Sequence, residues 1–253
     1  MKQPYGQNFL VEINIARRIV DAAGISSADK VIEIGPGKGI LTALIAPLAG
    51  SFKAIEVDRH LHDKLKLELA GYSNTEVILR DFLDYPFAAE QGPFKIISNL
   101  PYNVSTAILE KILPENNWSE AVVMVQKEVA DRLTAVSSTK QYGSFTVICG
   151  YYARFEKLFP VGPGCFFPKP KVDSTVLKLT NNFAAPLEPS FIKFVRAAFS
   201  QRRKMAVNSL ADSLGLEKAK VTEAFNRSSV ATTLRPENLN FEQFKLLFKN
   251  LFY

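Results

Sequence analysis

Residues 31–46 read Val-Ile-Glu-Ile-Gly-Pro-Gly-Lys-Gly-Ile-Leu-Thr-Ala-Leu-Ile-Ala. The stretch begins as a short apolar run of strand length. Gly35, Gly37 and Gly39 follow at alternate positions, and apolar residues at helical spacing come after them. A strand, a glycine turn and a helix form the unit that binds nucleotide-like ligands in doubly wound α/β folds. The G-x-G-x-G spacing differs from the dinucleotide pattern G-x-G-x-x-G, so a purely structural glycine turn is the alternative.

The chain around this unit alternates between strand and helix patterns. A helix ended by Gly24 precedes it, and apolar runs of strand length follow at 52–57, 75–79, 94–98 and 121–125, with a late strand at 173–179. Strands that alternate with helices predict a parallel sheet. Residues 143–152 fit neither pattern, and four prolines between 160 and 170 predict an extended segment.

The 253 residues, 47% of them apolar, can form one large domain and a small one. Pro186 and Pro189 mark a linker, which divides the chain into a domain over 1–180 and a helical domain over 181–253. The second part carries 11 Lys and Arg against 6 Asp and Glu, whereas the first carries 20 against 19. This basic excess suggests a polyanionic partner, with a solvated helical surface as the alternative.

Cys149 and Cys165 lack metal-ligand spacing, which predicts free thiols in a reducing compartment and no metal site. The N-terminus has no apolar signal core, and no apolar run reaches transmembrane length. We therefore expect a cytoplasmic protein with no membrane association.

Polar residues fall where the predicted strands end, the edge at which parallel sheets bind ligands. The Glu56 carboxylate can accept hydrogen bonds from both hydroxyls of a ribose. The Asp81 carboxylate could bind an adenine amino group, and Phe82 could stack on the base. The alternatives are a solvated acid at Glu56, and a turn-forming Asp81 with Phe82 in the core. Both acids would serve NAD as well as S-adenosylmethionine, so they leave the cofactor undecided.

Asn99-Leu100-Pro101-Tyr102, at the end of the fourth strand, predicts a platform for a base amine. The Asn99 side-chain oxygen and the Leu100 carbonyl can accept the two amine hydrogens, which frees the nitrogen lone pair for a methyl group. Pro101 fixes the turn, and Tyr102 can stack on the base. This chemistry requires no general base, and His60 and His62 are expected to be surface residues.

The sequence resembles the ribosomal RNA adenine dimethyltransferase family that modifies the small subunit. The matching segments are 6–10, 33–39, 56–58, 99–103, 125–133, 166–174 and 199–204. The resemblance implies a Rossmann-like methyltransferase fold with a mostly parallel seven-stranded sheet, followed by a small all-α C-terminal domain. It also implies S-adenosylmethionine as the cofactor.

The resemblance assigns roles to individual residues. It places the cofactor against Asn8, Leu10, Gly35, Gly37, Glu56, Asp81, Phe82 and Asn99. It places the target adenine against Asn99, Leu100, Pro101 and Tyr102, with Phe166 stacking from the other side. By pattern alone, Phe166 or Phe167 would more often be a packing residue at the rim. The sequence departs from the family at two places. Segment 162–165 is richer in glycine than the family's proline-led version, which affects the orientation of Phe166. Arg80-Asp81-Phe82 stands where Gly-Asp-Ala is common, which affects local packing only.

Gln201-Arg202-Arg203-Lys204 is expected to begin a helix in the basic domain. Arg202, Arg203 and Lys204, together with Lys171, are predicted to bind RNA phosphates, with a solvated helix start as the alternative.

The family relation implies dimethylation of two adjacent adenosines in the terminal hairpin loop of small-subunit (16S) rRNA. The substrate is expected to be rRNA within an immature small ribosomal subunit, bound by a monomer. A large-subunit (23S) adenine methyltransferase of the antibiotic-resistance type is one alternative, and an RNA-binding ribosome-assembly factor is another. A nicotinamide dehydrogenase is disfavoured by the glycine spacing.

Overall fold

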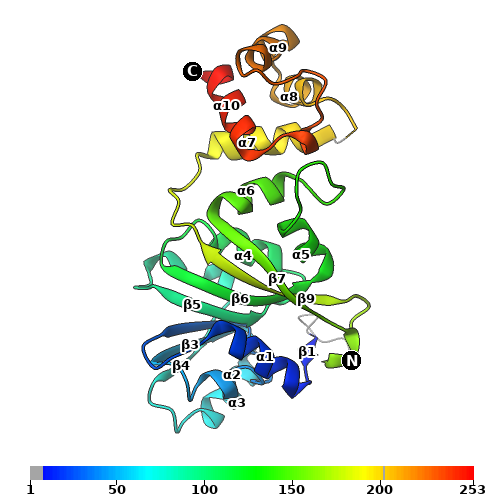
Figure 1. The fold of residues 1–253 in the computed structure, drawn as a ribbon. Helices are drawn as coiled ribbons and strands as arrows, with labels where there is room; N and C mark the ends of the chain where they lie inside the picture. Colours follow the sequence, from blue (N-terminus) through cyan, green and yellow to red (C-terminus); the bar gives the residue numbers. More distant parts are fainter. Residues whose placement is uncertain (1–7, 202) are drawn as a thin grey trace. The chain divides into compact units, whose positions relative to one another are not determined.

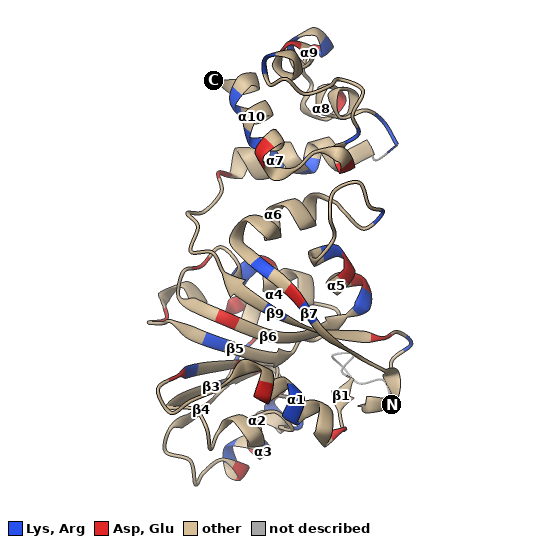
Figure 2. Cartoon of the chain, viewed as in Figure 1, with Lys and Arg blue, Asp and Glu red and all other residues tan. Residues whose placement is uncertain are grey.

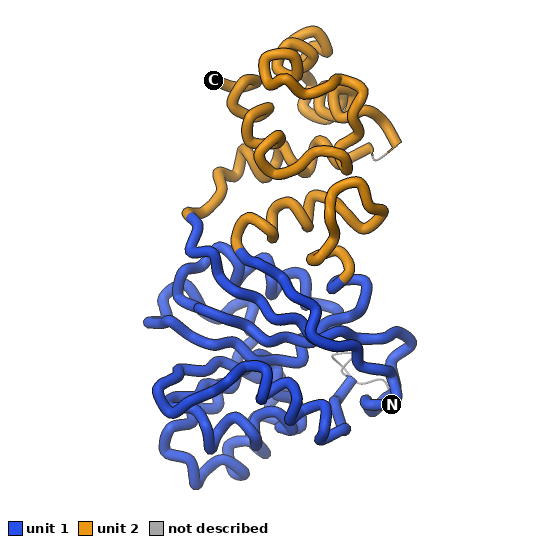
Figure 3. Tube along the Cα trace, in the orientation of Figure 1, with its two compact units in different colours: residues 1–130, 153–184 blue, residues 131–152, 185–253 orange. Residues whose placement is uncertain are grey.

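The computed structural model describes residues 8–201 and 203–253, which form two compact units (Figure 1). The first unit runs through residue 130 and includes 153–184, and the second comprises 131–152 and 185–253 (Figure 3). Residues 131–152 were expected in the first domain, but they group with the C-terminal helices. The assignment of cofactor binding to 1–180 and of RNA binding to 181–253 stays a prediction.

The first unit contains a seven-stranded sheet. Its strands, in spatial order, are β4 (Thr75–Leu79), β3 (Ser51–Glu56), β2 (Lys30–Ile34), β5 (Phe94–Asn99), β6 (Trp118–Gln126), β9 (Ser174–Asn181) and β7 (Ala153–Val161). The first five are mutually parallel, and β9 runs antiparallel to both of its neighbours. The predicted mostly parallel sheet of seven strands is therefore confirmed.

Helices and short turns connect these strands. They are α1 (Ile13–Ala23), α2 (Thr42–Ile45), α3 (Arg59–Glu68), η1 (Phe82–Asp84), η2 (Phe87–Ala89), α4 (Ser105–Ile112) and α5 (Lys127–Leu133). The apolar face of α1 packs against side chains of β5, β6 and β9. Gly24 ends α1, as predicted, and it adopts the left-handed conformation. The helix of the glycine unit is shorter than its apolar pattern suggests.

A second, separate pairing joins two short strands near the start and the middle of the chain. β1 (Phe9–Leu10) runs antiparallel to β8 (Phe166–Phe167), which follows the turn η3 (Pro163–Cys165). Phe9 lies opposite Phe167, and Leu10 lies opposite Phe166. The proline-rich segment thus contains the end of β7 and the whole of β8.

The second unit is helical and has its own core. Its elements are α6 (Ser144–Tyr152), α7 (Pro189–Ala198), η4 (Phe199–Gln201), α8 (Ala206–Leu214), α9 (Lys218–Arg227), η5 (Pro236–Asn238) and α10 (Phe241–Phe252). Phe191, Phe194, Phe244 and Phe248 are buried together in this core. A capping box formed by Asn240 and Gln243 begins α10.

Two local expectations differ from the structure. Residues 143–152, which fit no pattern, form α6. The helix expected at the basic run begins later than predicted, because α8 starts at Ala206. Among the described residues, no helix has both the length and the apolar character needed to cross a membrane.

Candidate functional site

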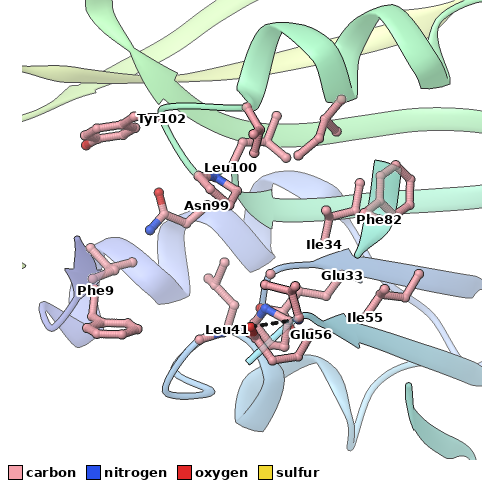
Figure 4. Close-up of a pocket in the computed structure, with 18 of the residues that line it drawn as sticks. Phe9, Glu33, Ile34, Leu41, Ile55, Glu56, Phe82, Asn99, Leu100 and Tyr102 are labelled. Atoms are coloured by element: carbon pink, nitrogen blue, oxygen red, sulfur yellow. Dashed lines mark hydrogen bonds between the residues drawn. The ribbon is translucent and has the colours of Figure 1, made fainter. Parts of the chain in front are cut away.

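A pocket lies at the edge of the sheet where β2, β3, β4 and β5 end (Figure 4). Its lining includes 8–10, 33–38, 55–57, 80–82 and 99–104. All eight residues predicted to bind the cofactor line this one pocket, as do four of the five predicted catalytic residues, Phe166 being the exception. Their individual roles stay predictions.

Two glycines at the end of β2 let other segments of the chain approach closely. Gly35 and Gly37 have φ of +65° and +59°, in the left-handed region that favours glycine. A Cβ atom at Gly35 would lie 3.3 Å from Pro101, and one at Gly37 would lie 3.0 Å from the Phe9 ring. The glycines therefore allow β1 and the Asn99–Tyr102 turn to approach the end of β2 closely.

Glu56 ends β3 with its carboxylate bound to the backbone. One oxygen accepts hydrogen bonds from the N–H groups of Val57 (3.0 Å) and Asp58 (2.9 Å), and the other accepts from Gly37 (2.9 Å; dashed in Figure 4). Burial raises the pKa of Glu56, and these three N–H groups oppose that shift. Since a carboxylate has about four acceptor positions, it keeps capacity for a ligand hydroxyl.

Glu33 is a pocket residue that the sequence analysis left without a role. It is 1% exposed, and the Thr42 hydroxyl donates a 2.7 Å hydrogen bond to its carboxyl group. Burial raises the pKa of Glu33 to about 8; the Thr42 bond opposes this shift and the charge of Glu56 adds to it. Glu33 is therefore mostly protonated at neutral pH. In the sequence, the only indication that Glu33 belongs to the pocket was its position two residues before Gly35.

Asp81 and Phe82 follow β4 on the far wall of the pocket. One Asp81 carboxylate oxygen accepts a 2.8 Å hydrogen bond from the Leu83 N–H and caps η1. Phe82 is buried against Tyr85 and Phe87, although part of it lines the pocket. Asp81 thus forms the turn and also faces the pocket, so the two interpretations weighed for it are compatible.

Asn99 ends β5, and its amide lies between Phe9 and Tyr102 in Figure 4. The amide nitrogen donates a 3.4 Å hydrogen bond to the Asn8 carbonyl. The side-chain oxygen is buried and has no hydrogen-bond partner among the described residues. A buried, unpaired acceptor costs free energy, typically about 1–3 kcal/mol, so this oxygen is available for a ligand donor.

Tyr102 is held by Ser174 at the start of β9. Their hydroxyl oxygens are 2.5 Å apart, and Ser174 is fully buried. The Phe166 ring packs edge-on against Tyr102, with ring centroids 6.4 Å apart. Phe166 is only 4% exposed, whereas Phe167 is 64% exposed. The structure thus brings Phe166 to the Tyr102 side of the site, but in a packed position.

The predicted RNA-binding residues differ in exposure and in ion pairing. Arg202 lies outside the described residues. Arg203 and Lys171 are exposed, and Lys204 forms a 3.3 Å ion pair with Asp212. Figure 2 shows positive charge along the loop between η4 and α8. Phosphate binding by these residues stays a prediction.

Solved structures with the same fold define the class of protein. One is a dimethyladenosine transferase from Plasmodium falciparum, with a TM-score of 0.79 and 26% identity, covering 94% of this chain and 95% of that one. Another is the 23S rRNA methyltransferase ErmE, with a TM-score of 0.71 and 28% identity, covering 96% and 99%. The fold is therefore that of a Rossmann-like methyltransferase.

The family follows from sequence. The family described as "Ribosomal RNA adenine dimethylase" matches residues 1–251. Two curated relatives are named ribosomal RNA small subunit methyltransferase A. The one from Malacoplasma penetrans is 42% identical, covering 94% of this chain and 87% of the relative, and the one from Syntrophus aciditrophicus is 39% identical, covering 98% and 93%. The chain belongs to the ribosomal RNA adenine dimethylase family, and the expected enzyme class is confirmed.

Proposed function

We propose that the protein transfers methyl groups from S-adenosylmethionine to the exocyclic amines of two adjacent adenosines in the terminal hairpin loop of small-subunit (16S) rRNA. The observation that carries this proposal is the buried side-chain oxygen of Asn99 at the end of β5, which has no hydrogen-bond partner within residues 8–201 and 203–253. An acceptor without a donor suits a substrate that supplies an N–H group.

The residues of the turn after β5 explain how an amine would be prepared. The lone pair of an exocyclic amine is delocalised into the ring. Asn99 Oδ1 and the Leu100 carbonyl accept the two amine hydrogens, which favours a pyramidal nitrogen with its lone pair directed at the methyl group. Tyr102, fixed by Ser174, stacks on the base. Positioning supplies most of the rate acceleration. The amine nitrogen gains the methyl group, the neutral thioether would be the leaving group, and the proton that the nitrogen loses passes to water.

The pocket fits S-adenosylmethionine, which supplies an activated methyl group when bound. Glu56 has one remaining acceptor position for a ribose hydroxyl, and Asp81 has a second carboxylate oxygen for the adenine amine. Gly35 and Gly37 let Pro101 and Phe9 pack close to the glycine turn, and these four residues all line the pocket. Asn8 and Leu10 close the pocket at the methionine end. Calorimetric titration would report binding of S-adenosylmethionine and none of NAD.

The names of the relatives support rRNA as the substrate. We assign the immature small ribosomal subunit as the form of the substrate that is methylated. We further propose that the enzyme acts as a monomer in the cytoplasm and uses no metal ion. In the described part of the chain, no cluster of three or more His, Cys, Asp or Glu residues could hold a metal ion.

Methylation of large-subunit rRNA is the second candidate, because ErmE shares the fold over 96% of this chain. The higher identity to the small-subunit relatives favours the first proposal. A primer-extension map of both rRNAs after reaction distinguishes the two candidates. We expect stops only at adjacent adenosines of the small-subunit rRNA, and modification confined to the large subunit would refute the proposal.

A further inference from the structure

Phe167 is an exposed aromatic residue beside a buried one. Its side chain is 64% exposed, whereas that of Phe166 is 4% exposed. A phenylalanine ring that stays in water is roughly 1.5–3 kcal/mol less favourable than one that is fully buried. The proposed mechanism gives Phe167 no role, and what sets it apart from other exposed apolar residues is its position beside the pocket.

The pairing of β1 with β8 places Phe167 next to the pocket. Phe9 and Phe167 are directly opposite each other, so their side chains lie on the same face of this antiparallel pair. Phe9 lines the pocket and lies close to Gly37. Phe167 therefore extends the pocket wall outward from Phe9, and its neighbour Phe166 packs against Tyr102.

One lysine lies close to the exposed ring, and two more follow it in the sequence. The Lys38 ammonium lies 4.9 Å from the Phe9 ring centroid and 5.9 Å from that of Phe167. Lys169 and Lys171 are exposed on the segment that follows β8. Within the described ranges, none of these three lysines forms an ion pair. Exposed aromatic rings beside unpaired cations are typical of surfaces that bind single-stranded nucleic acid.

We infer that Phe167 stacks on the base next to the target adenine, with Lys38 near the backbone of the same nucleotide. This role presupposes the proposed function. A base that enters the pocket must leave the RNA stack, so its neighbour loses a stacking partner. Phe167 lies where it can replace that partner. In the proposed substrate, the neighbour on one side is the second adenosine.

The test measures methyl transfer by the full chain to undermethylated small ribosomal subunits. Phe167→Ala is expected to raise KM for the subunits roughly five- to hundredfold, with kcat at saturation within about twofold of the wild-type value. Phe167→Tyr, which keeps an aromatic face, is expected to retain the wild-type KM. Subunits with an abasic nucleotide at the 5′ or 3′ neighbour of the target identify the base, because every base, uridine included, offers a face for stacking. At one of these two positions, the effect of Phe167→Ala should largely disappear.

Phe183→Ala is the matched control. Phe183 is 59% exposed and comes just after Asn181, the last residue of β9. Ser174, which binds Tyr102, is the first residue of this strand, about 20 Å away along it. This variant should leave KM unchanged. An unchanged KM in Phe167→Ala, or an equal rise on every RNA, would overturn the inference while leaving the proposed function intact. Failure of the wild-type protein to methylate these subunits would refute the proposed function itself.

Discussion

At the scale of single residues, the site depends on pairs that no local pattern could reveal. Thr42 binds Glu33 across nine residues, and Tyr102 binds Ser174 across 72. The sequence placed Glu56, Asp81 and Asn99 correctly at strand ends, because strand length and apolar pattern determine where a strand ends. It could not predict which side chains meet, because those contacts depend on tertiary packing.

Asn99→Ala should remove the amine acceptor. We expect kcat for methyl transfer to fall by about 100-fold or more, because preorganised polar groups in active sites contribute effects of this size. RNA binding should persist, because the basic residues outside the pocket are unchanged. Single-turnover methyl transfer and filter binding of rRNA measure the two quantities. Full activity in this variant would exclude Asn99 from the mechanism.

Ser174→Ala should release the Tyr102 ring. Loss of one hydrogen bond is expected to lower the free energy of unfolding by about 0.5–1.5 kcal/mol. It should also reduce kcat/KM severalfold, because the ring would no longer be held in one orientation. Tyr102→Phe breaks the same bond, so the double variant should be no worse than either single one. Additive losses in kcat/KM would show that Ser174 acts independently of Tyr102.

Glu33 should make the stability of the cofactor-free protein depend on pH. Burial raises the pKa of Glu33 from 4.5 to about 8, so between these values the folded chain binds a proton that the unfolded chain has lost. Stability should therefore fall as the pH rises from 4.5 towards 8. Glu33→Gln should flatten this dependence in urea-unfolding midpoints measured at about pH 5.5, 7 and 8.5. Parallel pH profiles for the two proteins would contradict the assignment.

At the scale of elements, the alternation of strands and helices predicted β2 to β6, but β7 was missed. Its sequence contains Pro160, which was interpreted as part of an extended rim. Proline is tolerated in edge strands, and β7 pairs with β9 alone. Its register also shifts between Lys157 and Phe159, which interrupts the alternating pattern. The position of β7 at the edge therefore explains why its sequence is weakly strand-like.

Gly37→Ala tests the glycine turn. An alanine at this positive φ costs about 1–2 kcal/mol of folding free energy, and its Cβ would also lie 3.0 Å from Phe9. Gly24→Ala is the matched control, because Gly24 has φ of +52° and a Cβ atom added there would meet no atom within 4 Å. Both variants should lower the thermal midpoint, but only Gly37→Ala should weaken cofactor binding in calorimetry. Equal cofactor affinity in the two variants would show that the glycine turn does not contribute to cofactor binding.

At the scale of the whole molecule, the chain divides into a sheet unit that holds the pocket and a helical unit with its own aromatic core. The sequence placed the basic excess in the last 73 residues, but it assigned 131–152 to the first domain. Helix α6 in that segment has little amphipathic pattern, because its sequence is apolar on most sides. The pattern of prolines therefore pointed to a linker near Pro186, but nothing in the sequence indicated the earlier excursion of the chain into the helical unit.

Dimethylation of adenines in small-subunit rRNA can be followed through the transferred methyl group itself. Undermethylated small ribosomal subunits are incubated with the protein and S-adenosylmethionine labelled in its methyl group, and the nucleosides of the rRNA are then separated. We predict label in N6,N6-dimethyladenosine, at two nucleosides per subunit on completion. Absence of label from adenosine, or label in another nucleoside, would contradict the account.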